Sequence, residues 1–173
     1  VQFSADFGDD RTLDAIAAGL ERIAASTGCG VALFRAGAAP WHDDIECLHR
    51  VASRMPAASV KVFESLDVWD ICALVASARA YCGSSLHGRI VAVAFARPRV
   101  NLRHPGSGDR CTRQSAFAQT WEPAGVPATV GVEAIAEGID RALAANQASL
   151  EHTARRLASH CRHGFEAIGA RLT

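Results

Sequence analysis

The chain has 173 residues, of which 49% are hydrophobic, and its 18 basic and 18 acidic side chains give a formal net charge of zero. This length and composition predict one ordinary domain with a sizeable core. No cluster of basic residues forms a polybasic face, which argues against nucleic acid and anionic membranes as partners. No apolar run has membrane-spanning length and no secretory signal is visible, so we expect no transmembrane segment.

Six cysteines occur, and none forms a Cys-x-x-Cys pair. A globular chain of this size needs no disulfide bonds, so we expect reduced thiols and a cytoplasmic location. The chain opens on Val1, Gln2 and Phe3, which have the composition of the end of a strand, and it carries no initiator methionine. We therefore expect it to be part of a longer protein.

Apolar residues at helical spacing alternate along the chain with short apolar runs typical of strands. In chain order, the predicted elements are the end of a strand at 1–3, a helix over 11–27, a strand at 31–34, a helix over 45–55, a strand at 60–63, a helix from 68, a strand at 80–82, a helix over 86–96, a strand at 100–102, a short helix at 115–121, and helices over 132–143 and 150–172. Asp67 is expected to cap the third helix. Residues 91–95 are apolar on every side, which indicates a buried helix.

This alternation predicts an α/β fold, a Rossmann-like single domain with a parallel sheet, helices on both faces and a long C-terminal helix. Ligands of such sheets bind at the carboxyl ends of the strands. We therefore expect the loops at 4–10, 35–42 and 83–89 to meet there, together with the loop after Leu102.

The turn at 83–89 concentrates groups that bind anions. Gly83 lets the chain turn sharply, and either Ser84 or Ser85 can cap the helix that follows, whose first amides point outward. His87 and Arg89 lie near the same opening. Together these groups predict an anion site at the N-terminus of a helix.

A plainer interpretation of this turn is an ordinary serine cap, with His87 bonded to a neighbouring backbone group. That interpretation leaves Gly88 unexplained, because glycine inside a helix costs about 1 kcal/mol relative to alanine. A serine hydrolase is disfavoured, since its nucleophile motif needs glycine two residues after the serine, where His87 stands. We therefore favour a binding site.

Other clusters point less clearly to chemistry. Asp43 and Asp44 have a plain use as a helix start beside His42. The glycines at 106–108 form only part of a dinucleotide-binding pattern, because Cys111 stands where a third glycine is needed. No cluster of ligands has the spacing of a metal site, and we predict neither a metal nor an organic cofactor.

Residues 74–78, 83–88, 92–95 and 97–100 resemble the polysaccharide pyruvyl transferase family. Its signature is a strand, a small polar turn ending in Leu-His or Phe-His, an apolar helix and a strand led by proline. The opening segment at 8–14 looks similar too. The resemblance covers most of residues 1–145.

The resemblance implies a two-domain, glycosyltransferase-B-like architecture of which this chain is the C-terminal half. Residues 1–145 would form the Rossmann-like donor-binding domain. Residues 146–173 would form a helix that packs on it or on a missing N-terminal domain. Members transfer pyruvate from phosphoenolpyruvate to two hydroxyls of a sugar as a cyclic ketal, so the implied partners are phosphoenolpyruvate and a sugar or lipid-linked oligosaccharide of exopolysaccharide biosynthesis.

Carried onto this sequence, the resemblance makes His87 the general acid or base. Ser84, Ser85, Gly88 and Arg89 would hold the donor anion. Ser85 stands where many members carry arginine, and we expect Arg89 to supply that charge. In the loop after Leu102, where relatives often carry lysine, the candidate ligands are Arg103, His104 and Arg110.

Two other functions fit the same fold. A nucleotide-sugar-dependent glycosyltransferase domain would need an acidic residue for the ribose hydroxyls, and Glu122 is the candidate. A non-catalytic binding module would keep the architecture without chemistry, and substitution of His87 would then leave binding intact.

Overall fold

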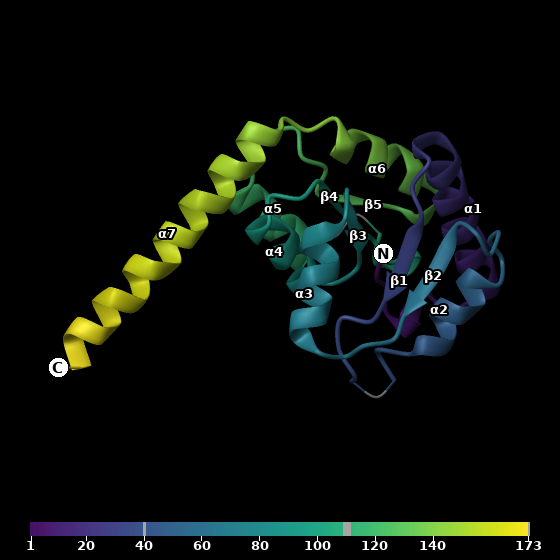
Figure 1. The fold of residues 1–173 in the computed structure, drawn as a ribbon, viewed down its shortest axis with the longest axis horizontal. Coiled ribbons are helices and arrows are strands. Elements are labelled where there is room, and N and C mark those ends of the chain that lie inside the picture. The colour runs from purple at the N-terminus through teal and green to yellow at the C-terminus, as the bar shows by residue number, and fades with distance from the viewer. Residues whose placement is uncertain (40, 109–111, 173) are drawn as a thin grey trace.

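The computed structural model describes residues 1–39, 41–108 and 112–172. Parallel strands form its centre (Figure 1). The strand β1 (Val31–Phe34) pairs with β2 (Val60–Phe63). In a second group, β3 (Tyr81–Gly83) pairs with β4 (Arg99–Leu102), and β4 pairs with β5 (Thr129–Val130).

Val1 and Gln2 join these two groups of strands. The amide of Phe34 donates to the carbonyl of Val1 at 3.0 Å, and the amide of Gln2 donates to the carbonyl of Cys82 at 3.0 Å. The spatial order is therefore β2, β1, residues 1 and 2, β3, β4, β5, which is the doubly wound Rossmann order. The order reverses between Gln2 and β3, where such folds bind ligands.

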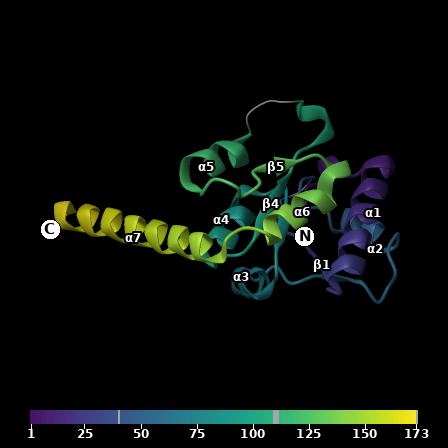
Figure 2. The same ribbon diagram turned by 90° about the horizontal axis from the view of Figure 1, so that it is seen from above.

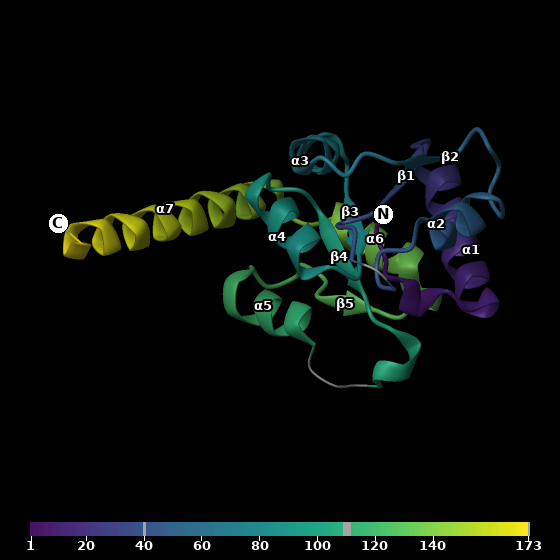
Figure 3. The same ribbon diagram turned by 90° about the horizontal axis from the view of Figure 1, so that it is seen from below.

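Helices cover both faces of this sheet (Figures 1 and 3). On one face lie α1 (Asp10–Thr27), α2 (Ile45–Ala52) and α6 (Ile135–Leu143), whose buried side chains form the larger core. On the other face, α3 (Val68–Ser77) and α4 (Leu86–Ala94) enclose a smaller cluster. The predicted α/β fold is confirmed.

Aspartates begin three of these helices, as the sequence leads one to expect. Asp9 accepts from the amide of Thr12 at 3.0 Å, and Asp44 caps α2 in the same way. The carboxylate of Asp67 accepts from the amides at the start of α3, which confirms the predicted cap. Gly28 ends α1 with a φ of 66°, a left-handed conformation that glycine adopts without strain.

The remaining elements are short, with one exception. The single-turn 3₁₀ helices are η1 (Ala5–Phe7), η2 (Pro105–Ser107) and η3 (Val132–Ala134), and α5 (Arg113–Trp121) follows η2. The long helix α7 (Gln147–Leu172) starts against α4 and then projects from the body, as Figures 1 and 2 show.

Only the first part of α7 is packed. Leu150 and Thr153 are buried, whereas Phe165, Ile168 and Leu172 on the outer part are exposed. That the outer part packs on another domain, and that the chain divides near residue 145, stay predictions. Within the described residues, the structure has no helix that is both long and apolar enough to span a bilayer.

Candidate functional site

Four loops meet at the carboxyl edge of the sheet. The amide of Ser4 donates to the hydroxyl of Ser84 at 3.1 Å, which joins the first loop to the turn after β3. The amide of Ala5 donates to the carbonyl of His42 at 2.8 Å, which brings in the loop after β1. Nε2 of His104, after β4, lies 2.8 Å from the carbonyl of Asp6. The predicted meeting of these loops is therefore confirmed.

The N-terminus of α4 opens onto this edge. The hydroxyl of Ser85 caps the helix by accepting from the amide of Gly88 at 3.2 Å. Among the described residues, no acceptor faces the amides of Leu86 and His87, the first two of the helix. The His87 side chain is exposed. The helix therefore presents two free donors, a positive dipole end and an imidazole to solvent.

Ser84 stands beside this helix end and is half-buried. Its amide donates to the carbonyl of Gln2 at 3.0 Å, and its carbonyl accepts from the side chain of Gln114 at 2.5 Å. Its hydroxyl oxygen accepts from Ser4, which leaves the hydroxyl hydrogen to donate elsewhere. Ser84 is thus fixed in place with one donor available.

The side chain of Tyr81 explains why positions 83 and 88 are glycine, which the sequence analysis did not predict. A Cβ added to Gly83 would lie 2.5 Å from the hydroxyl oxygen of Tyr81, and one added to Gly88 would lie 2.6 Å from Cζ of the same ring. Both glycines therefore make room for the buried Tyr81 side chain. The ring of Tyr81 thus accounts for Gly88 without a ligand, and the role of Gly88 in binding stays a prediction.

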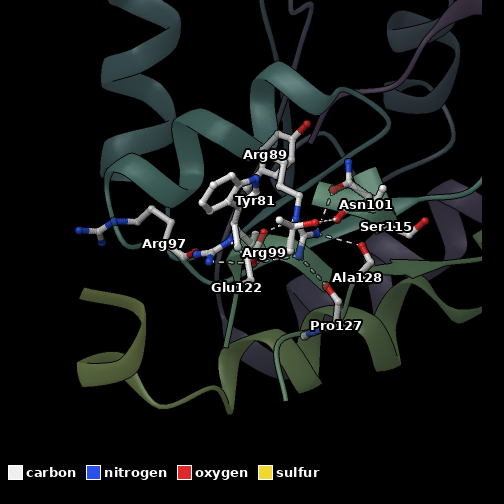
Figure 4. Close-up of polar contacts among 12 residues, drawn as sticks. Tyr81, Arg89, Arg97, Arg99, Asn101, Ser115, Glu122, Pro127 and Ala128 are labelled. Atoms are coloured by element: carbon white, nitrogen blue, oxygen red, sulfur yellow. Dashed lines mark hydrogen bonds and ion pairs between the residues drawn. The ribbon is translucent and has the colours of Figure 1, made fainter. Parts of the chain in front are cut away.

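Arg89 points away from the edge and into the protein (Figure 4). Its guanidinium is 0% exposed and forms hydrogen bonds of 2.6 and 3.0 Å with the carboxylate of Glu122. Its remaining donors reach Asn101, Ala128 and Pro127 at 2.9 to 3.2 Å. With every bond directed inward, Arg89 has none left for a ligand, and the expectation that it holds the donor anion is corrected.

Glu122 is shared by a second arginine. Nε of Arg99 donates to Oε2 of Glu122 at 2.8 Å, and both side chains are buried. Burial lowers the pKa of the Arg99 guanidinium, an effect that the carboxylate of Glu122 opposes. Glu122 is therefore the counter-ion of two buried arginines and is not placed to bind the ribose of a nucleotide sugar.

The side chain of His104 links the loop after β4 to the first loop of the chain through hydrogen bonds. Its Nδ1 accepts from the amide of Gly106 at 3.0 Å, so its Nε2 carries the proton that it donates to the carbonyl of Asp6. Both ring nitrogens are thus engaged, and His104 is not a ligand for an anion in this arrangement. Arg103 is half-buried, and its amide donates to Val130 at the end of β5. Arg110, the third candidate of this loop, lies outside the described residues.

Sequence reasoning did not single out Arg35, which directly follows β1 on the same edge of the sheet. Arg35 is half-buried, and its Nε is buried with no hydrogen-bond partner among the described residues. A buried N–H donor without an acceptor is costly, and a ligand oxygen at this position would satisfy it. Its position directly after an apolar strand is the signal that could have identified it.

The other polar residues of this edge do not form a metal centre. Nδ1 of His42 lies 3.1 Å from Oδ1 of Asp43, whose second oxygen accepts from the amide of Ala39. Within the part of the chain that the structure describes, no three histidine, cysteine or acidic side chains are grouped so as to hold a metal ion.

A comparison with protein families matches residues 30–105 to the model named polysaccharide pyruvyl transferase. The matched segment runs from the residue before β1 into η2, so it includes the turn after β3, His87 and His104. No curated protein matches the chain. The resemblance to this family is thereby confirmed over the matched residues.

Proposed function

From this family match, we propose that the chain is a pyruvyl transferase domain. It binds phosphoenolpyruvate at the N-terminus of α4 and transfers the pyruvyl group to two hydroxyls of a sugar as a ketal. The observation that carries the proposal is the exposed His87 beside two unpaired helix amides, at the strand reversal and inside the matched segment.

The groups at this edge suit a small molecule with two anionic ends. Phosphoenolpyruvate carries a phosphate and a carboxylate. The amides of Leu86 and His87 and the hydroxyl of Ser84 would bind one of these groups at the positive end of the helix. Arg35 takes the place of Arg89 in the proposed set, because its buried Nε has no hydrogen-bond partner among the described residues.

Ketal formation needs protons to move in both directions. A proton is added to the methylene carbon of the donor, and one sugar hydroxyl adds to the neighbouring carbon and loses its proton. The bond from that carbon to the phosphate oxygen then breaks, and phosphate leaves with the electron pair. The second hydroxyl then adds to the same carbon and loses its proton. Of the two protons that the sugar hydroxyls lose, one balances the proton added to the methylene carbon and the other leaves with the phosphate.

In this scheme His87 is the general acid or base. Histidine exchanges protons near neutrality, and the exposed imidazole of His87 can reach a molecule seated on the helix end. Ser85 supports it as the cap that fixes the first turn of α4. The proposal includes a sugar or lipid-linked acceptor, a second domain that closes the site, and action in the cytoplasm during exopolysaccharide synthesis.

Calorimetric titration with phosphoenolpyruvate, UDP and GDP tests the donor. We expect phosphoenolpyruvate to bind, and Ser84→Ala and Arg35→Gln to weaken its binding at least several-fold. Arg155→Gln, on the exposed part of α7, is the matched control and should bind normally. Tight binding of UDP or GDP without binding of phosphoenolpyruvate would overturn the proposal.

A second assay separates binding from chemistry. With a sugar acceptor, His87→Gln should bind phosphoenolpyruvate within a few-fold of the unmodified protein but release phosphate at least 100-fold more slowly. The control His152→Gln alters an exposed histidine on α7 and should keep the full rate. Unchanged turnover in His87→Gln would remove this residue from the mechanism.

A further inference from the structure

The loop between β1 and α2 carries two side chains that the proposed donor site does not use. Trp41 is 95% exposed, and His42 next to it is exposed as well. This loop follows the carboxyl end of a parallel strand, as does the turn that leads into α4. Both side chains therefore lie at the edge of the sheet where the donor would bind.

Contacts with the first loop of the chain limit the distance between this loop and the donor groups. The amide of Ala5 donates to the carbonyl of His42 at 2.8 Å. The amide of the preceding residue, Ser4, donates to the hydroxyl of Ser84 at 3.1 Å. Because consecutive residues are only about 3.8 Å apart, the carbonyl of His42 lies within roughly 10 Å of the Ser84 hydroxyl. The donor and one sugar ring together can span such a distance.

A carboxylate orients the imidazole of His42. Nδ1 of His42 lies 3.1 Å from Oδ1 of Asp43, whose side chain is only 9% exposed, and Oδ2 of Asp43 accepts from the amide of Ala39 at 2.9 Å. The amides of His42 and Asp43 both donate to the carbonyl of Ala39, which fixes the backbone of this turn. Since a carboxylate only accepts, Nδ1 carries the proton, and Nε2 of the neutral ring is left as a proton acceptor.

The indole of Trp41 is exposed at a cost to the backbone. Its φ of 68° lies in the left-handed region, which bulky side chains rarely adopt. Because the residue is almost entirely open to solvent, packing against the protein does not offset this strain. Strained backbone of this kind is concentrated at sites that bind ligands. A flat aromatic face beside polar groups suits a ligand that has an apolar face and a polar rim.

We propose that Trp41 and His42 form the subsite for the acceptor sugar, an inference that rests on the proposed function. A pyranose ring has C–H groups on its faces and hydroxyls around its rim, so it can stack on the indole while its hydroxyls reach Nε2 of His42. Nucleobases stack on aromatic side chains too, but a base brings no pair of hydroxyls to His42. The pairing of an indole with a proton acceptor therefore favours a sugar.

In this subsite His42 is the base that the transfer needs in addition to His87. As a sugar hydroxyl adds to the carbon that carries the phosphate oxygen, its O–H bond breaks and the proton passes to Nε2 of His42. His42 releases this proton to water, the bond from carbon to the phosphate oxygen breaks, and the second hydroxyl adds in the same way. Of the two protons removed, one replaces the proton that His87 gives to the methylene carbon, and the other leaves with phosphate. Asp43 is a positioning residue, since it keeps the proton of His42 on Nδ1.

NMR titration of the isotope-labelled chain tests the subsite. The probes are the methyl glycosides of glucose, galactose and mannose, each with and without saturating phosphoenolpyruvate. We expect at least one of them to shift the indole N–H of Trp41 and the amide of His42 saturably. The indole of Trp69, which is 77% exposed on α3, should not move. Trp41→Ala should abolish the shift at His42, whereas Trp41→Phe, which keeps a flat ring, and the control Trp69→Ala should retain it.

Absence of a saturable shift at Trp41 with all three sugars would overturn the subsite. A saturable shift at Trp41 with UDP or GDP in place of the sugars would overturn it as well. Shifts at Leu86 and Ser84 with phosphoenolpyruvate report separately on the donor. Their absence would count against the proposed function, while the sugar titration would still decide the subsite.

The role of His42 has measurements of its own. Nitrogen NMR should place its proton on Nδ1, whereas His104, whose Nδ1 accepts from an amide, should carry the proton on Nε2. Asp43→Asn should weaken this preference in His42, because an amide can also donate to Nδ1. A proton on Nε2 of His42 in the unmodified protein would remove its role as the base.

Turnover provides the second measurement. His42→Gln should bind phosphoenolpyruvate and the sugar within a few-fold of the unmodified protein but release phosphate at least tenfold more slowly. Added imidazole should restore part of the rate to His42→Ala, which a purely structural role would not allow. His49→Gln, at an exposed histidine on α2, is the control and should keep the full rate. Full turnover in His42→Gln would contradict the assignment.

Discussion

Arg89 and Glu122 form a bidentate ion pair, in which Nε lies 2.6 Å from Oε1 and Nη2 lies 3.0 Å from Oε2. Their side chains are only 0% and 1% exposed. Removing Arg89 leaves Glu122 paired with Arg99 but takes the donor from the acceptors of Asn101, Pro127 and Ala128. Because each buried acceptor without a donor costs about 1–3 kcal/mol, Arg89→Ala should lower the free energy of unfolding by about 3–5 kcal/mol, measured by urea denaturation. Arg155→Ala, which alters an exposed arginine on α7, should change it by less than about 1 kcal/mol.

This result would bear on any binding study of Arg89. Loss of phosphoenolpyruvate binding in Arg89→Ala would follow from unfolding and would carry no information on contact with the donor. An Arg89→Ala protein of normal stability would contradict the buried ion pair and would return Arg89 to the candidate ligands.

Gly88 and Gly164 make a matched pair of helical glycines. Glycine to alanine in an open helix raises stability by up to about 1 kcal/mol, which we expect for Gly164→Ala because nothing lies near its Cβ position. Gly88→Ala should instead lower stability by about 1–3 kcal/mol, since its new methyl group meets the ring of Tyr81. Thermal unfolding of both variants measures the contrast, and a stabilised Gly88→Ala would show that the ring does not fill this space.

The cysteines should differ in reactivity toward iodoacetamide at pH 8. A hydrogen bond from Arg79, 3.0 Å from the sulfur, lowers the pKa of the Cys29 thiol, whereas burial raises the pKa of Cys82 to about 12. Mass spectrometry of the native protein should show labelling at Cys29 and none at Cys82. Arg79→Ala should slow labelling at Cys29, and an unchanged rate would show that this arginine does not activate the thiol.

Local signals in the sequence were enough to predict the order of the elements. The strands at 31–34 and 60–63 have the predicted bounds, and Asp67 caps α3 as expected. The two-residue strand β5 was missed because so short a segment has no periodicity. The meeting of the loops followed from the parallel sheet, since the carboxyl ends of its strands share one edge.

The candidate site could be predicted only in part. His87 and Ser84 lie at the helix end as expected, because their placement depends on the local turn after β3. Arg89 was misassigned because its partner Glu122 is 33 residues away, and no local pattern reveals that pairing. The cause of Gly88 was missed for a different reason: Tyr81 is close in sequence, but its contact with the first turn of α4 depends on how β3 and α4 pack, which residue spacing does not reveal.

Titration of the isotope-labelled chain with phosphoenolpyruvate, followed by amide NMR shifts, tests the central claim most directly. The account predicts saturable shifts centred on the amides of Leu86, His87 and Ser84, with smaller ones at Ser4 and Asp6 across the loop contacts. Absence of shifts at the start of α4, or saturable shifts confined to the residues around Cys29, would contradict a donor site at this helix end.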